Sequence, residues 1–242
     1  MHYQPRAVLT THIACYAWNP DTMLLTHRFQ DHDNPRALCV ILHGLGDSHL
    51  GMAGLAAELR LDEITFMLPD APDPYVIGYS WYTIPEEFFT SASPMSRKEL
   101  IESSREEVGR SRELVHRLLS EISDQFPGVP VILGGFSQGG LIALDAGFQW
   151  PHPLAAIFAL SSYFPQADEV LGSSPQSRQT PVFVGHGTAD DVVRHDYGVE
   201  TAESLRTHGW DVEFYSDDGL PHSVSARELA RLREFLMRSL TD

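Results

Sequence analysis

Short, largely apolar runs recur along the chain and predict eight β-strands. They cover residues 7–15, 22–29, 37–42, 64–68, 129–134, 155–160, 181–185 and 211–215. From residue 37 onward, runs such as ALCVIL and PVFVG are apolar at nearly every position. Such runs are typical of strands buried on both faces of a parallel sheet. The first two runs flank the turn-forming stretch WNPDT and predict a hairpin at the sheet edge.

Apolar residues at helical spacing predict helices between these strands. The expected helices span residues 52–60, 97–126, 138–148, 197–206 and 226–240. Two of them begin with a capping box, formed by Ser96 with Glu99 and by Ser225 with Glu228. The alternation predicts an α/β fold with a mostly parallel central sheet of about eight strands and helices on both faces.

Length, composition and charge limit the possible functions. The 242 residues are 43% hydrophobic and 21% charged, which is typical of one globular domain over residues 1–242. A formal net charge of −16 would repel nucleic acid and anionic membrane surfaces. There is no secretion signal and no apolar run of about 18 residues. We therefore expect a cytoplasmic protein with no nucleic-acid partner and no stable membrane insertion.

The stretch GFSQG, residues 135–139, places Ser137 between two glycines, directly after a buried strand and before a helix. This is the G-x-S-x-G pattern of a nucleophile elbow in its required context. The tight turn demands minimal side chains at Gly135 and Gly139, and it raises the serine hydroxyl above the sheet edge.

A serine hydroxyl becomes a strong nucleophile only with a histidine base that is oriented by a carboxylate. On this type of fold the partners follow in the order Ser, Asp or Glu, His. Asp190 and Asp191 lie on the loop after the strand at 181–185, and His222 precedes the last helix. Chain order therefore selects His222 as the base and one of the two aspartates as its partner.

Acyl transfer also requires N–H donors for the oxyanion of the tetrahedral intermediate. The stretch LHGLGD, residues 42–47, follows a buried strand, and its glycines allow the Leu45 amide to face Ser137. The amide of Gln138, the residue after the nucleophile, is the expected second donor.

Metal and cofactor chemistry have little support in the sequence. The patterns H-E-x-x-H, paired C-x-x-C and G-x-x-x-x-G-K-[ST] are missing, and the cluster of His27, Asp31, His32 and Asp33 is interpreted as a solvated loop. We expect neither a cofactor nor a bound metal.

With these residues in view, the sequence resembles the phospholipase/carboxylesterase family of α/β-hydrolases, which includes bacterial carboxylesterases and acyl-protein thioesterases. The resemblance runs from about residue 37 to the C-terminus, which would be the catalytic core, and leaves residues 1–36 as an added edge hairpin. It rests on LHGLGD, LPDAP, SWY, LIESS, GGFSQGG, ALSSYFP, HGTADDVV and PHSVS, in that order. The 73–79 segment is shorter than the loop usual in the family, which bears on substrate preference.

The resemblance implies a role for each matched residue. Ser137 is the nucleophile, His222 the base and Asp190 the carboxylate, with Asp191 as the fallback. Leu45 and Gln138 form the oxyanion hole, and Trp81 lies in the region that lines the acyl-binding cleft. A homodimer would suit the family.

The function expected is a serine hydrolase that cleaves carboxylic esters, thioesters or lysophospholipids of short to medium acyl chains through an acyl-enzyme. The alternative is a catalytically silent protein of the same fold that binds a ligand or partner. Such a protein is free to lose Ser137, Asp190 or His222, and this chain keeps all three. A peptidase of this fold would need an added lid or propeller domain, for which there is no spare length.

Overall fold

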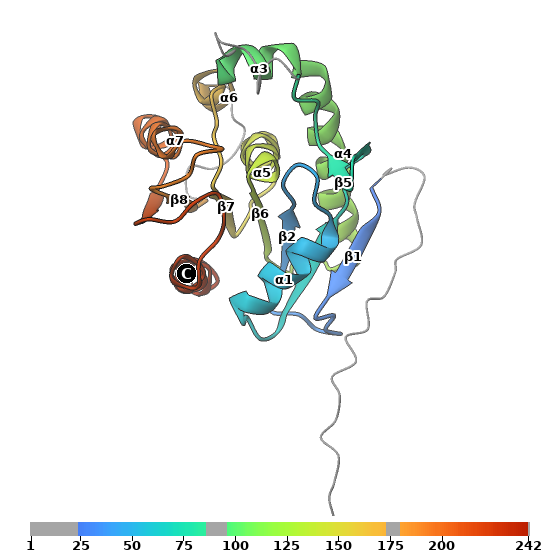
Figure 1. The fold of residues 1–242 in the computed structure, drawn as a ribbon. Helices are drawn as coiled ribbons and strands as arrows, with labels where there is room; N and C mark the ends of the chain where they lie inside the picture. Colours follow the sequence, from blue (N-terminus) through green and yellow to red (C-terminus); the bar gives the residue numbers. More distant parts are fainter. Residues whose placement is uncertain (1–23, 86–95, 173–179, 242) are drawn as a thin grey trace, which may run out of the picture.

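A seven-stranded sheet forms the centre of the computed structural model, which describes residues 24–85, 96–172 and 180–241. Its strand order is β1-β3-β2-β6-β7-β8-β9 (Figure 1). Strand β1 is antiparallel to β3, and the other neighbours pair in parallel. The strands are β1 (Thr26–Phe29), β2 (Ala37–Leu42), β3 (Ile64–Pro69), β6 (Val131–Phe136), β7 (Ala156–Leu160), β8 (Val182–Gly187) and β9 (Val212–Asp217).

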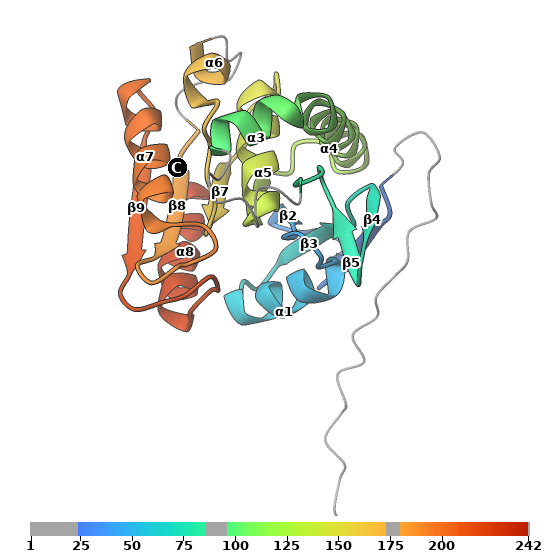
Figure 2. The ribbon, with the colours of Figure 1, turned by 45° about the horizontal axis from the view of Figure 1, so that its top comes forward.

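Helices cover both faces of this sheet, as Figures 1 and 2 show. Helices α1 and α8 pack on one face, and α4, α5 and α7 pack on the other. Along β2, Cys39 and Ile41 contact the first layer, whereas Leu38, Val40 and Leu42 contact the second. The predicted fold class is therefore confirmed. The helices are α1 (His49–Leu59), α3 (Arg97–Ser103), α4 (Arg105–Gln125), α5 (Gln138–Gln149), α6 (Ala167–Gly172), α7 (His195–Thr207) and α8 (Ala226–Ser239).

The helix predicted over residues 97–126 is interrupted at Ser104, so that α3 and α4 are separate helices. The backbone of Ser104 has φ −101° and ψ 13°, and its buried hydroxyl donates to the carbonyl of Thr83 at 2.8 Å. A serine that bonds to a neighbouring segment in this way competes with the regular helix. The predicted capping box of Ser96 and Glu99 is present at the start of α3.

The hairpin formed by β4 (Asp73–Tyr75) and β5 (Gly78–Ser80) was not predicted from the sequence. It holds the loop after β2, because the amide of Tyr79 donates to the carbonyl of Asp47 at 2.9 Å and the amide of Gly46 donates to the carbonyl of Tyr79 at 2.9 Å. A Cβ at Gly78 would lie 2.4 Å from the carbonyl oxygens of Gly46 and Asp47. The close approach of these backbones therefore requires glycine at residue 78.

The predicted edge hairpin is only partly within the described residues. Its second strand, expected at 22–29, corresponds to β1 at the edge of the sheet. The strand predicted at 7–15 and the turn at 18–22 lie outside the described residues, so the hairpin stays a prediction.

Ser225 caps the N-terminus of helix α8, because its hydroxyl oxygen accepts from the amide of Glu228 at 3.1 Å. The predicted capping box forms only in half, because neither carboxyl oxygen of Glu228 has a hydrogen-bond partner among the residues that the structure describes. The side chain is instead fully buried against Gly185 of β8. Burial, and next the negative charge of Asp217, raises the pKa of Glu228 to about 8.

The Glu228→Gln variant should become more stable than the wild type as the pH rises. The folded-state pKa lies above the ordinary value, so the stability that the protonated carboxyl contributes is present below about pH 4.5 and is lost as the pH rises towards 8. Glutamine does not titrate, and the difference in the free energy of unfolding should grow by a few kcal/mol, at most about 5, across that range.

Urea unfolding of both proteins at several pH values measures this difference. Glu203→Gln, on the exposed face of α7, is the matched control and should follow the wild type at every pH. Equal pH slopes for wild type and Glu228→Gln would contradict the assignment of a buried, protonated carboxyl.

Candidate active site

Ser137 stands at the turn between β6 and α5 in a backbone conformation that residues other than glycine rarely adopt, with φ 52° and ψ −117°. Its amide donates to the carbonyl of Leu160 at 2.9 Å, which ties the turn to β7. A Cβ at Gly139 would lie 2.2 Å from the carbonyl oxygen of Leu42, and a Cβ at Gly135 would lie 2.5 Å from the backbone of Gly139. Both glycines are needed because strand and helix approach each other this closely.

The structure brings Ser137, His222 and Asp190 together, although 85 residues separate the first two along the chain. The Nε2 atom of His222 lies 3.0 Å from the hydroxyl oxygen of Ser137, and its Nδ1 atom lies 2.7 Å from Oδ2 of Asp190. A carboxylate only accepts, so Nδ1 carries a proton and Nε2 is free to accept the serine proton. This is the arrangement that activates a serine hydroxyl.

Asp190 is buried at the end of β8 and is held from several sides. Its Oδ1 atom accepts from the amides of Val192 and Val193 at 3.0 and 2.8 Å, and Nε2 of His186 lies 3.3 Å from Oδ2. Burial by itself raises the pKa of Asp190, but bonds from His186, His222 and Val193 outweigh it and hold the pKa below its usual range. The carboxyl therefore stays ionised beside the imidazole of His222.

Leu45 and Gln138 both line the same cavity as Ser137 and His222, as expected of oxyanion-hole residues. Gln138 is the first residue of α5, where unpaired amides and the helix dipole favour negative charge. Asp191, the fallback carboxylate, is exposed, and Asp190 is the carboxylate that accepts the hydrogen bond from His222.

The structure does not bring Trp81 to this cavity: the side chain is fully buried and is missing from the described residues that line it. Its indole Nε1 donates to the carbonyl of His43 at 2.9 Å, and its amide donates to Oε1 of Gln138 at 2.8 Å. Trp81 therefore joins the loop after β2 to the start of α5. Its contribution to the site is to hold these two segments in place, and no contact with the substrate is expected.

The cavity at Ser137 has a volume of about 240 Å³ and is lined largely by apolar side chains. Several of its lining residues were not singled out from the sequence as site residues, namely Gly44, Asp47, Ile84, Phe136, Tyr163, Val192 and Val193. Six of these seven lie within the motifs that carry the family resemblance, so those motifs contain a signal for them. Gly44 and Asp47 lie in LHGLGD, Phe136 in GGFSQGG, Tyr163 in ALSSYFP, and Val192 and Val193 in HGTADDVV. Ile84 lies in no such motif.

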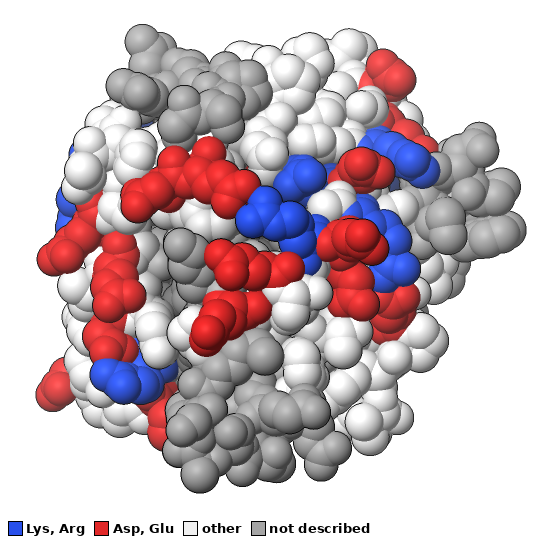
Figure 3. All heavy atoms as spheres, turned by 90° about the horizontal axis from the view of Figure 1, so that it is seen from above, with Lys and Arg blue, Asp and Glu red and all other residues white. Residues whose placement is uncertain are grey.

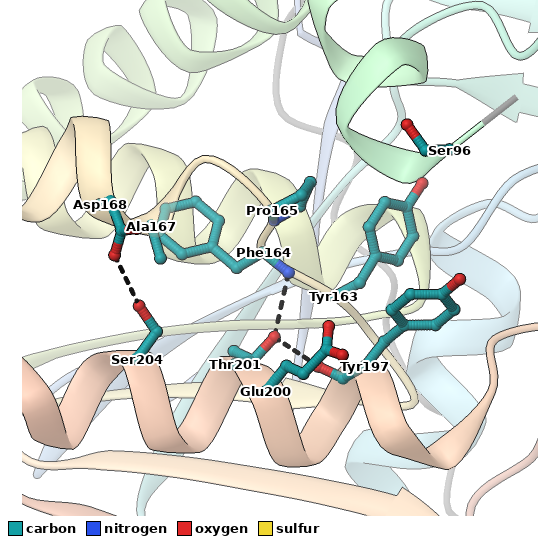
Figure 4. A pocket seen from close by; sticks show the side chains of 10 residues that line it. All are labelled: Ser96, Tyr163, Phe164, Pro165, Ala167, Asp168, Tyr197, Glu200, Thr201 and Ser204. Carbon is teal, nitrogen blue, oxygen red and sulfur yellow. Dashed lines mark hydrogen bonds between the residues drawn. The ribbon is translucent and has the colours of Figure 1, made fainter.

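A second cavity, of about 340 Å³, lies beside Tyr163, which lines both cavities. Figure 4 shows it between Ser96, the segment at residues 163–168 and helix α7. The hydroxyl of Thr201 in α7 joins two walls of this cavity, because it accepts from the amide of Phe164 at 3.0 Å and donates to the carbonyl of Tyr197 at 2.8 Å. The hydroxyl of Tyr163 itself lies 2.7 Å from that of Tyr82, which fixes the ring between the two cavities.

Acidic side chains make up the larger share of the charged surface in Figure 3, in agreement with the net charge of −16. Some acidic side chains of the described residues are paired, as in the exposed contact of Arg105 with Glu169 at 2.7 Å. A surface of this sign does not attract anionic ligands at long range.

Comparisons with known proteins bear on the family and the fold of the chain. A family model described as Phospholipase/Carboxylesterase matches residues 29–240. Acyl-protein thioesterase 1 of Emericella nidulans is 34% identical, over 84% of this chain and 90% of the relative. The solved structure of esterase PE8 has a TM-score of 0.75 at 25% identity, over 84% of this chain and 93% of that one. The solved structure of Zea mays acyl-protein thioesterase 2 has a TM-score of 0.73 at 26% identity, over 89% of this chain and 98% of that one.

Asp190→Asn should lower kcat by about 10⁴, because an amide can donate to Nδ1 and so favour the wrong tautomer of His222. Asp191→Asn is the matched control, and it should retain nearly full activity because its side chain is exposed and does not bond to His222. Hydrolysis of a p-nitrophenyl ester measures both variants. A large loss in Asp191→Asn with little loss in Asp190→Asn would reverse the assignment.

Trp81→Phe should lower stability without changing acyl-chain preference. The variant leaves the buried carbonyl of His43 without its indole donor, which costs about 1–3 kcal/mol. Urea unfolding measures the loss, and relative kcat/KM for esters of graded chain length measures the preference. Ile84→Ala, whose side chain lines the cavity, is the comparison and should shift the preference towards longer chains. A shift in Trp81→Phe as large as that in Ile84→Ala would return Trp81 to the acyl-binding wall.

Proposed function

The chain belongs to the phospholipase/carboxylesterase family, and from this premise we propose that it hydrolyses acyl esters and thioesters through a covalent acyl-enzyme on Ser137. The enzyme class, a serine hydrolase of ester or thioester bonds, follows from the family. The observation that carries the residue assignment is the position of His222, which lies within hydrogen-bond distance of Ser137 on one side and of Asp190 on the other.

In the acylation step, the hydroxyl oxygen of Ser137 attacks the carbonyl carbon of the substrate while Nε2 of His222 takes the hydroxyl proton. The positive charge on the imidazolium is stabilised by Asp190, whose pKa is held low by its buried hydrogen bonds. The carbonyl oxygen becomes an oxyanion, and the amides of Leu45 and Gln138 are the proposed donors to it.

The tetrahedral intermediate then collapses, and the bond from carbon to the leaving oxygen or sulfur breaks. The leaving alcohol or thiol takes the proton from His222, which restores the neutral base. A water molecule next attacks the acyl carbon while Nε2 of His222 takes its proton. The bond between the acyl carbon and the serine oxygen then breaks, Ser137 takes the proton back from His222, and the carboxylic acid is released. No cofactor enters either step.

The cavity at Ser137 supports a preference for short to medium acyl chains. Its volume of about 240 Å³ is at the small end for a ligand pocket, and its walls include the apolar side chains of Leu45, Ile84, Val192 and Val193. The names of the relatives, acyl-protein thioesterases and an esterase, support both thioesters and oxygen esters as substrates. Lysophospholipids are the third proposed class.

Nothing supports the alternative of a catalytically silent binding protein, because Ser137, His222 and Asp190 keep a hydrogen-bonded geometry that a binding protein would not need. None of the described helices is both long and apolar enough to cross a membrane. The cytoplasmic location, the single domain over residues 1–242, the homodimer and the absence of a nucleic-acid partner stay predictions.

Ser137→Ala should lower kcat on the order of 10⁶-fold, because the members of such a triad act as a unit. A fluorophosphonate should also phosphonylate the wild type once per chain, with an oxygen–phosphorus bond formed at Ser137 and fluoride released. Mass spectrometry of peptides locates the label, and ester hydrolysis measures kcat. Ser120→Ala, at an exposed position of α4, is the control and should behave as the wild type. Label on another residue would refute the nucleophile.

A further inference from the structure

Three potential metal ligands from distant parts of the sequence meet beside the edge of the sheet. His27 lies in β1, His49 is the first residue of α1, and Asp70 directly follows β3. In the antiparallel pairing of β1 with β3, His27 is opposite Leu68, which places His27 and Asp70 on the same face of the sheet. One ligand atom from each of the three residues lies within 4.8 Å of the others.

Asp70 is buried and already oriented towards the two histidines. Its Oδ1 atom accepts from the backbone amide of His49 at 2.7 Å, and Oδ2 lies 2.9 Å from Nδ1 of His49. The same Oδ2 atom lies 3.5 Å from Nε2 of His27. Hydrogen bonds of this kind fix a carboxylate in metal sites and hold it ready for the ion.

His27 is the least satisfied member of the cluster. It is 6% exposed, and neither of its ring nitrogens has a hydrogen-bond partner among the residues that the structure describes. Its ring stacks on that of His49, with centroids 3.5 Å apart and planes inclined by 17°, so one ring must turn before both can point a nitrogen at the same ion. A buried polar atom without a partner costs free energy, and a bound ion would give a partner to Nε2 of His27, the ring nitrogen that faces Asp70.

We propose that His27, His49 and Asp70 bind one divalent transition-metal ion of the Zn²⁺ class. Two imidazoles and a carboxylate form a donor set that such ions prefer over Mg²⁺ and Ca²⁺, which favour oxygen ligands. The three protein ligands leave a fourth position for water. Binding replaces the proton that now lies between Nδ1 of His49 and Asp70, and this proton moves to Nε2 of the same ring or to solvent.

The ion would join β1, the start of α1 and the end of β3. Helix α1 directly follows the segment at residues 44–47, part of which lines the catalytic cavity, so the ion would stiffen one support of that cavity.

No metal was expected from the sequence, because the known metal-binding motifs place their ligands at short, regular spacing. His27 was grouped with Asp31, His32 and Asp33, its neighbours along the chain. The proposed ligands are separated by more than twenty residues at each step and become neighbours only in the folded sheet.

His27→Phe tests the proposal. Phenylalanine keeps a ring to stack on His49 but removes both nitrogens, which have no partner to lose among the described residues. The untagged full chain, freed of metal with a chelator, is titrated with ZnCl₂ and followed by calorimetry, elemental analysis and thermal unfolding. The wild type should bind one Zn²⁺ per chain and unfold at a higher temperature with Zn²⁺. His27→Phe should bind at least about 100-fold more weakly, with no fall in melting temperature when metal-free.

His32→Phe is the matched control, because it removes a nearby histidine outside the cluster and should bind Zn²⁺ as the wild type does. His49→Gln, at a partly exposed position, decides the result if His27→Phe fails to fold, and it should also lose Zn²⁺ binding. Mg²⁺ should not compete for the site. A wild type that binds no Zn²⁺, or variants at residues 27 and 49 that bind it undiminished, would overturn the proposal.

Discussion

The backbone of Ser137 is the constraint on which the site depends. A non-glycine residue held at φ 52° costs on the order of 1–3 kcal/mol, and it persists only where the surroundings fix it. Here β6 is paired on both sides, with β2 and β7, and nearly every residue of α5 is buried. Gly135 and Gly139 permit the close packing that holds the turn. This backbone conformation places the Ser137 hydroxyl within hydrogen-bond distance of Nε2 of His222.

Buried hydrogen bonds then fix the other parts of the site relative to this turn. The side chain of Gln138 contacts the amide of Trp81 and the carbonyl of Tyr82, and the indole of Trp81 contacts the carbonyl of His43. In a low-dielectric interior such a chain of bonds is rigid when all members are satisfied. The loop that contains Leu45 and the helix that begins at Gln138 therefore keep a fixed spacing, which a preorganised oxyanion hole requires.

The features that could be predicted from the sequence depend on local pattern or on chain order. Runs that are apolar at nearly every position predicted the parallel strands. The G-x-S-x-G turn, followed along the chain by Asp190 and then His222, predicted which side chains meet. The break at Ser104 could not be foreseen, because it depends on a bond to Thr83, twenty-one residues earlier. The burial of Trp81 and the cluster at His27 depend on which segments pack together, and no spacing along the chain contains that information.

We infer that the turn at Ser137 aims the reacting atom between His222 and the two backbone amides. A crystal structure of the enzyme phosphonylated at Ser137 would show whether it does, because the phosphoryl oxygen occupies the position of the oxyanion. This oxygen should lie about 2.7–3.1 Å from the backbone nitrogens of both Leu45 and Gln138, with Ser137 still at positive φ. A phosphoryl oxygen turned away from both amides, or a Ser137 backbone relaxed to negative φ, would contradict it.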